Sequence, residues 1–87
     1  MANPLDDKTI IELFNQGGAN ADHAFKAIVN QYGKQLYGQI RGIARNHELT
    51  NDILQNVLIK VYQNLSKFKG DSALYTWMYR ITRNESI

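Results

Sequence analysis

Residues 67–84, KFKGDSALYTWMYRITRN, decide the fold of this chain of 87 residues. On a helical wheel, four apolar side chains of the second part fall on one side: Leu74, Trp77, Met78 and Ile81. The first part, around Gly70, interrupts the preceding helix, and Ser72 is expected to cap the helix that follows. A single apolar stripe after a short loop predicts a helix that packs onto neighbouring helices.

The same stretch carries more aromatic and cationic side chains than packing requires. They are Tyr75 and Tyr79 on one flank of the stripe, Thr76, Arg80 and Arg83 opposite it, and Asn84 on the other flank. With Phe68 between Lys67 and Lys69, they form a surface that suits single-stranded nucleic acid, because every base can stack on an aromatic ring. Tyrosines at the edge of a bundle and solvated cations explain the pattern equally well.

Three further segments show helical periodicity, at residues 9–16, 21–45 and 53–65, and no segment alternates convincingly as a strand does. The longest segment has an apolar stripe: Phe25, Ile28, Val29, Tyr32, Leu36, Ile40 and Ile43. The connections are short, which favours antiparallel neighbours. We therefore expect an all-α fold, a compact bundle of three main helices plus a short N-terminal helix, in a single domain over residues 1–87.

The expected helix ends rest on local capping chemistry. Gly17 and Gly18 are expected to end the first helix, because glycine readily adopts the conformation of a helix C-terminus. Asn20 is expected to cap the second helix, and Thr50 or Glu48 lies near the start of the third.

Composition narrows the class of protein. There is no cysteine, which excludes disulfides and thiolate zinc sites and fits a reducing cytoplasm. The acidic start, MANPLDDKTI, has no signal-peptide pattern, and no aliphatic run is long enough to span a membrane. Residues 1–25 hold four carboxylates and one lysine, whereas residues 60–83 hold five cations and one carboxylate. The basic final third indicates a polyanionic partner or a solvated face.

The sequence lacks catalytic and metal-binding patterns. His23 and His47 lie on different elements, and neither has a second ligand at metal-binding spacing. The glycines of GGAN lack the length and the lysine of a phosphate-binding loop, and no serine sits in a nucleophile elbow. We therefore expect a protein that is not an enzyme and that uses no cofactor and no metal.

The third helix has a polar face of another kind. The residues on this face or at its border are Asp52, Gln55, Asn56, Ile59 and Gln63. Ile59 is out of register with the core. It is either an isolated exposed isoleucine or the apolar centre of a protein contact with a polar rim.

The polar face of the third helix and the aromatic, cationic surface of residues 67–84 occur together in one family. Residues 51–84, NDILQNVLIKVYQNLSKFKGDSALYTWMYRITRN, resemble the second conserved region of bacterial RNA polymerase sigma factors, especially the extracytoplasmic-function (ECF) group. The pattern of that group is an acidic ED-x-x-Q-E-x-F helix followed by F-x-G-x-S-x-x-x-T-W-L-Y-R-I-A-x-N. The matching residues are Asp52, Gln55, Phe68, Gly70, Ser72, Thr76, Trp77, Tyr79, Arg80, Ile81 and Asn84. The resemblance extends back to AFKAIVNQYGKQLYGQIRGIAR and covers residues 24–87.

The resemblance implies two partners. The first is core RNA polymerase, through the coiled-coil clamp helices of its β′ subunit, and the residues implied in that contact are Asp52, Gln55, Asn56 and Ile59. The second is promoter DNA, as the non-template single strand of the −10 element. In the family a loop after the clamp-binding helix captures a flipped-out base, and its residues here are Phe68, Lys69, Gly70, Asp71 and Ser72. The residues implied along the neighbouring strand path are Tyr75, Thr76, Arg80 and Asn84.

The sequence departs from the family pattern at several places. Asn51 and Asn56 stand where glutamate is frequent, which weakens charge pairing with the clamp helices, and Arg83 replaces a small residue and adds a candidate phosphate contact. The C-terminal helix-turn-helix domain (region 4) that reads the −35 element has no counterpart here, so the resemblance implies a fragment of a longer chain. An anti-sigma protein, which often covers these faces in the family, is a further candidate partner.

Two other functions stay open from the residues alone. One is a helical protein-interaction domain whose basic edge is only solvated, and it would bind no nucleic acid. The other is an ordinary helix-turn-helix protein, which would prefer duplex DNA to a single strand.

Overall fold

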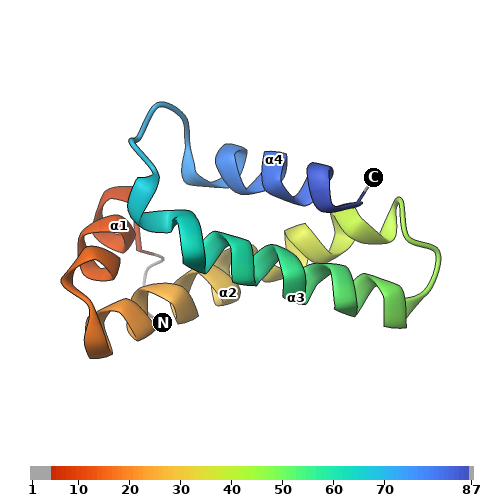
Figure 1. The fold of residues 1–87 in the computed structure, drawn as a ribbon, viewed down its shortest axis with the longest axis horizontal. Helices are drawn as coiled ribbons and strands as arrows, with labels where there is room; N and C mark the ends of the chain where they lie inside the picture. Colours follow the sequence, from red (N-terminus) through yellow and green to blue (C-terminus); the bar gives the residue numbers. More distant parts are fainter. Residues whose placement is uncertain (1–4, 87) are drawn as a thin grey trace.

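The structure is a computed structural model that describes residues 5–86, and no strand occurs in this range. Its helices are α1 (Asp7–Gln16), α2 (Gly18–Arg41), α3 (His47–Asn64), the short 3-10 helix η1 (Leu65–Lys67) and α4 (Leu74–Ser86). Figure 1 shows α2 and α3 running in opposite directions, α4 returning beside α3, and α1 at the end where η1 lies. The prediction of an all-α bundle with three main helices and a short leading helix is confirmed.

Buried apolar side chains from all four helices and from η1 form one core. The large ones that are fully buried are Ile10, Ile28, Leu36, Ile40, Val57, Val61, Leu65, Leu74 and Met78. Burial of such a side chain stabilises the fold by about 1.5–3 kcal/mol. Trp77 and Ile81 are half-buried against the edge of this core. The apolar stripe predicted for the last helix therefore faces the core, with its two outer members partly exposed.

The first two helices are separated by a single residue, Gly17. Its N–H donates to Phe14 O at 3.1 Å, and it ends α1 as predicted. Gly17 and Gly18 have φ values of 75° and 56°, which glycine adopts without steric cost, so the chain reverses over two residues. The prediction that Asn20 caps α2 is wrong, because α2 begins at Gly18 and has no side-chain cap.

The turn from α2 to α3 begins earlier than predicted. The helix ends at Arg41 rather than at residue 45, and Ile43 lies 49% exposed while Ala44 is buried. Val29, which the sequence also assigned to the apolar stripe, is 38% exposed. The stripe was read from a helix extended too far, so its last member was placed on the wrong side.

The N-terminus of α3 is capped by Asn46, whose Oδ1 accepts from Leu49 N–H at 2.7 Å. Thr50 is not the cap. It is fully buried one turn into the helix, and its Oγ1 donates to Asn46 O at 2.7 Å. Glu48 lies in the first turn, where its charge is favourable to the helix dipole, but it is not the cap either. The prediction that Thr50 or Glu48 lies near the start of this helix is therefore confirmed by Glu48, while Asn46 supplies the cap.

Candidate nucleic-acid interface

The loop that connects η1 to α4 turns at Gly70. This residue has φ 79°, in the left-handed region that favours glycine. Phe68, at the start of the loop, is half-buried, and its ring centroid lies 5.3 Å from that of Trp77. Lys69, Gly70 and Asp71 are exposed. An aromatic contact therefore anchors the start of the loop on α4, and solvent reaches the residues that follow.

Asp7 of α1 holds the start of α4. Its Oδ2 accepts from Leu74 N–H at 2.9 Å, and its Oδ1 accepts from the Tyr32 hydroxyl at 3.3 Å. Burial, followed by the charge and hydrogen bond of Asp7, raises the pKa of Tyr32 above its ordinary value. Ser72 does not cap this helix as predicted, since its Oγ donates to Ala73 O at 3.1 Å. A residue far away in the sequence supplies the acceptor that a local serine was expected to supply.

A hollow of about 170 Å³ lies between this loop and α4, and we call it the loop hollow. The residues that line it are Lys67, Phe68, Lys69, Asp71, Ser72, Trp77 and Arg80. The lining of this hollow thus combines two aromatic side chains, one hydroxyl and three cations, and it includes a single carboxylate. Aromatic faces suit a base, and cations suit its phosphate.

The opposite side of the loop faces α1. A separate hollow is lined there by four residues of the loop segment and four of α1, the latter being Asp7, Lys8, Ile11 and Glu12. The sequence did not connect these α1 residues with the loop, since this part of the chain stood out only as an acidic start. No local signal could have connected them with the loop, because the contact depends on how α1 packs.

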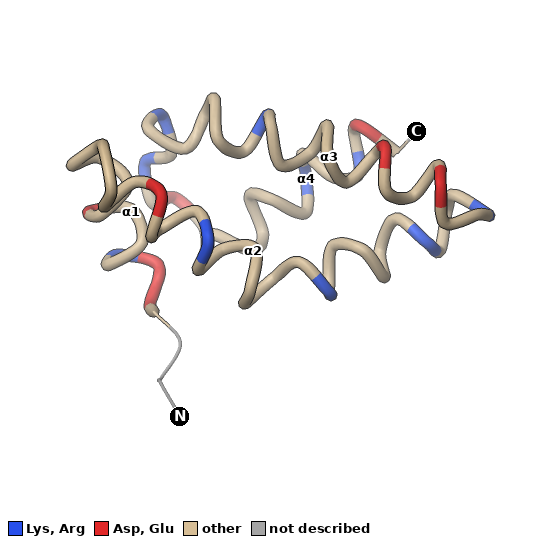
Figure 2. The backbone as a smooth tube through the Cα atoms, turned by 90° about the horizontal axis from the view of Figure 1, so that it is seen from below, with Lys and Arg blue, Asp and Glu red and all other residues tan. Residues whose placement is uncertain are grey.

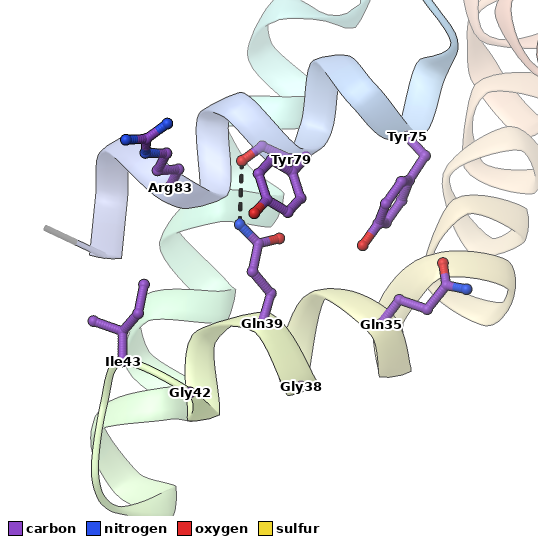
Figure 3. Close-up of a pocket in the computed structure, with 8 residues that line it drawn as sticks. All are labelled: Gln35, Gly38, Gln39, Gly42, Ile43, Tyr75, Tyr79 and Arg83. Atoms are coloured by element: carbon purple, nitrogen blue, oxygen red, sulfur yellow. Dashed lines mark hydrogen bonds between the residues drawn. The ribbon is translucent and has the colours of Figure 1, made fainter.

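A larger, open hollow of about 780 Å³ lies on the other flank of α4, against α2, and we call it the interhelix hollow. Its lining residues, drawn in Figure 3, are Gln35, Gly38, Gln39, Gly42 and Ile43 of α2 and Tyr75, Tyr79 and Arg83 of α4. Tyr75 and Tyr79 point from α4 toward α2, and Gln39 points from α2 toward α4. The Nε2 of Gln39 donates to Tyr79 O at 3.3 Å, which ties the two helices together.

The structure divides the predicted DNA-binding residues between these two hollows. Arg80 joins the loop residues, whereas Arg83 joins the two tyrosines. Thr76 is exposed, and so is Asn84, and neither lines either hollow. The helical wheel placed both arginines opposite the core, and the packing of α2 beside α4 separates them.

Both kinds of charge are spread along the molecule. Figure 2 shows Asp and Glu mainly toward the two ends, and Lys and Arg along the whole length, including both ends. Within residues 5–86 the only ion pair joins Lys60 of α3 to Glu85 of α4. Arg80 and Arg83 are exposed and take no part in it, so both remain available to a polyanion.

The outer side of α3 differs in chemistry, and we call it the α3 face: Asp52, Gln55, Asn56, Ile59 and Tyr62. All five are exposed, with Ile59 at 53% and Tyr62 at 45%. Beside them runs a largely apolar groove lined by Phe25, Gln55, Leu58, Ile59, Tyr62 and Gln63. The Tyr62 ring makes edge contacts with Phe14 and Phe25, at centroid distances of 5.2 and 5.3 Å. The sequence singled out Ile59 but missed the aromatic part of this surface.

Two further observations concern the part of the chain that the structure describes. No three or more of its His, Asp and Glu side chains gather where they could hold a metal ion. None of its helices combines the length and apolar character needed to cross a membrane.

Known proteins are similar to this chain in sequence. Residues 28–87 match the family described as Sigma-70 region 2. The chain is 36% identical over 85 residues to the ECF RNA polymerase sigma-E factor of Haemophilus influenzae. It is 35% identical over 78 residues to the RNA polymerase sigma-H factor of Pseudomonas aeruginosa, and 32% identical over 84 residues to the ECF RNA polymerase sigma-E factor of Escherichia coli.

The chain therefore belongs to the sigma-70 region 2 family, in its ECF group, and the resemblance predicted from the sequence is confirmed. The three alignments cover 97%, 90% and 97% of this chain. They cover only 42%, 39% and 42% of the relatives, so the chain spans about two fifths of the length of the curated relatives it matches.

Proposed function

We propose that this domain acts in transcription initiation as the part of a sigma factor that docks on core RNA polymerase and recognises the −10 promoter element. The observation that supports it is the presence of two chemically different surfaces on neighbouring helices. The α3 face is apolar and rich in amides, whereas α4 and its loop are aromatic and cationic. One surface suits a protein, and the other suits a nucleic acid strand.

The α3 face is the proposed docking surface for the clamp helices of the β′ subunit. Ile59 and Tyr62 supply an exposed apolar centre, and Gln55 and Asn56 supply a polar rim. This arrangement is typical of protein interfaces, in which a few central side chains carry most of the binding energy. Asp52 is the one carboxylate of this face and would contribute a charge contact at the rim.

The loop hollow is the proposed pocket for a flipped-out base of the non-template strand. Extruding a base costs a few kcal/mol, and stacking on aromatic side chains such as Phe68 and Trp77 returns about 1–3 kcal/mol per base. Ser72 and the backbone around Gly70 would select the base, and Arg80 with Lys69 would hold phosphates. From this pocket the strand would follow the exposed side of α4, past Thr76, toward Arg83 and Asn84.

Binding of promoter DNA in two forms tests the proposal. A labelled single strand with the non-template −10 sequence is titrated into the protein, and so is the same sequence as a duplex. The single strand should bind more tightly, and a Tyr75→Ala, Arg80→Ala double variant should bind it roughly tenfold or more weakly, since each lost base stack is worth about 1–3 kcal/mol. A β′ clamp-helix fragment should bind both proteins equally.

The other outcomes identify the alternatives. Preference for the duplex would indicate an ordinary helix-turn-helix protein. Absence of any salt-dependent DNA binding, together with binding of some protein through the α3 face, would indicate a helical interaction domain with a solvated basic edge. Absence of binding to both DNA and clamp helices would overturn the proposal. An anti-sigma protein, if one regulates this domain, would compete with both ligands.

A further inference from the structure

Gln39 lies in the interhelix hollow with half of its amide unsatisfied. The Nε2 donates to Tyr79 O, which sets the orientation of the amide, and the Oε1 is buried without a hydrogen-bond partner. A buried acceptor in this state costs about 1–3 kcal/mol, and nearly all buried polar atoms in proteins have a partner. An open acceptor at this position suits a ligand that brings a donor.

The rest of the hollow suits a nucleotide. Tyr75 is half-buried and Tyr79 is 45% exposed, and their ring centroids lie 6.3 Å apart. Such rings offer faces on which a base can stack. Arg83 lies at the end away from Tyr75 in Figure 3, where its guanidinium is available to a phosphate. None of the described residues that line this hollow carries a negative charge, so none repels an anionic ligand.

Gly38 leaves room beside Gln39. Outside the adjacent backbone of α2, a Cβ added at Gly38 would meet no atom within 4 Å, so this glycine serves no close packing against another element. Glycine inside a helix destabilises it by about 1 kcal/mol relative to alanine. Gly38 therefore weakens α2 and leaves open space in the wall of the hollow. A ligand that occupies this space would explain why a glycine stands inside the helix.

We infer that the interhelix hollow binds a second base of the separated strand, one with an exocyclic amino group (adenine, cytosine or guanine), and that this amino group donates to Gln39 Oε1. The inference rests on the proposed function, because it requires that a single strand runs along α4. Adenine, cytosine and guanine all present an exocyclic amino group to an acceptor. Thymine presents only its N3–H, flanked by two carbonyl oxygens that repel Gln39 Oε1.

Tyr79 controls access to this acceptor. The Oε1 of Gln39 is buried, and the Tyr79 ring lies beside it in Figure 3. Because Tyr79 is 45% exposed, its ring has solvent on one side into which it can rotate. The entering base then takes the position next to Gln39, and the displaced ring remains close enough to stack on it.

Three short, labelled homopolymers, of deoxyadenosine, deoxycytidine and thymidine, test the inference by fluorescence anisotropy. The Gln39→Leu variant removes the acceptor and keeps a helix-forming side chain. It should weaken binding of the adenine and cytosine strands about tenfold, because the amino group of the bound base is then buried without its acceptor. Its affinity for the thymidine strand should change less than about twofold. Gly38→Leu fills the hollow and should weaken binding of all three strands.

Asn30→Leu is the matched control, because Asn30 is exposed on α2 outside the hollow and the change adds the same side chain. It should leave all three affinities unchanged. If Gln39→Leu and Gly38→Leu both bind all three strands as tightly as the wild type, the inference is overturned. The proposed function would still stand in that case if Arg80→Ala weakens binding. If the wild-type protein binds no single strand, the proposed function fails and this inference fails with it.

Discussion

The exposed sides of α3 and α4 are neighbours with opposite chemistry. From Asp52 to Gln63 the only exposed cation of α3 is Lys60, and it is paired with Glu85. On α4 the exposed side chains include two unpaired arginines and a tyrosine, with hollows on both flanks. One shared core holds both helices, so the two surfaces keep a constant spacing while their chemistry differs. We therefore expect substitutions on one surface to leave binding at the other unchanged.

The largest expected effect is that of Ile59→Asp. It places a charge at the apolar centre of the α3 face and should weaken binding of a β′ clamp-helix fragment about a hundredfold, since central interface residues often contribute more than 2 kcal/mol. Binding of single-stranded DNA should be unchanged. Asn30→Asp makes a comparable charge change on the exposed side of α2 and serves as the control. Equal loss of clamp and DNA binding in Ile59→Asp would mean that the two surfaces are not independent.

Arg80→Ala makes the reciprocal change on α4. The affinity for single-stranded −10 DNA should fall roughly tenfold at low salt, and the slope of log affinity against log salt should decrease by about 0.7, as expected for one lost phosphate contact. Clamp-fragment binding should be retained. Lys26→Ala removes an exposed cation of α2 that lines neither hollow and should leave the slope unchanged. An unchanged slope in Arg80→Ala would place the strand elsewhere.

Asp7→Ala tests the contact that joins α1 to the DNA-binding side. It leaves Leu74 N–H and the Tyr32 hydroxyl without their acceptor, and it should lower the free energy of unfolding by about 1–3 kcal/mol. Asp7→Asn keeps one acceptor oxygen, so its free energy of unfolding should fall less than that of Asp7→Ala. Urea unfolding measures both. A value for Asp7→Ala within a few tenths of wild type would show that α4 starts without help from α1.

Asn46→Ala removes the N-cap of α3, the helix that carries the proposed polymerase contact. The lost acceptor for Leu49 N–H should cost about 1 kcal/mol of stability. Asn46→Asp retains an acceptor at the N-terminus and should be close to wild type in the same urea experiment. If Asn46→Ala is as stable as the wild type, another group accepts the hydrogen bond from the first turn of α3.

The smallest effect concerns Asp6 and appears only in acid. Hydrogen bonds from the side chain and backbone of Thr9 lower the pKa of Asp6 below its ordinary value of 3.8. Because the folded-state pKa is the lower one, the contribution of Asp6 is present above pH 3.8 and is lost as the pH falls through the folded-state pKa. Asp6→Asn still caps α1 but does not titrate, so its stability should decline less steeply below about pH 4 in thermal unfolding. Identical pH profiles would contradict this assignment.

Local patterns predicted the helices and the sides that they bury. Leu74 and Met78 are buried and Ile59 is exposed, as their periodicity indicated. The helix ends were less predictable, since two of the predicted caps, Asn20 and Ser72, were wrong. The chain reverses at Gly17, so α2 begins before Asn20. At the start of α4, Leu74 N–H donates to the carboxylate of Asp7, which belongs to another helix, and not to Ser72. Capping depends on which acceptor is closest in space, and an acceptor distant in the sequence leaves no local signal.

The sequence by itself determined the all-α class, most of the apolar stripe of each main helix and the motif from Phe68 to Asn84, because these depend on the spacing of residues along one chain segment. Only the tertiary structure decided that Arg80 and Arg83 face different hollows, that Asp7 holds the start of α4, and that Gln39 is left with an open acceptor. Each of these depends on which helix packs beside α4. That choice is made by the burial of apolar side chains far apart in the sequence, which no single segment encodes.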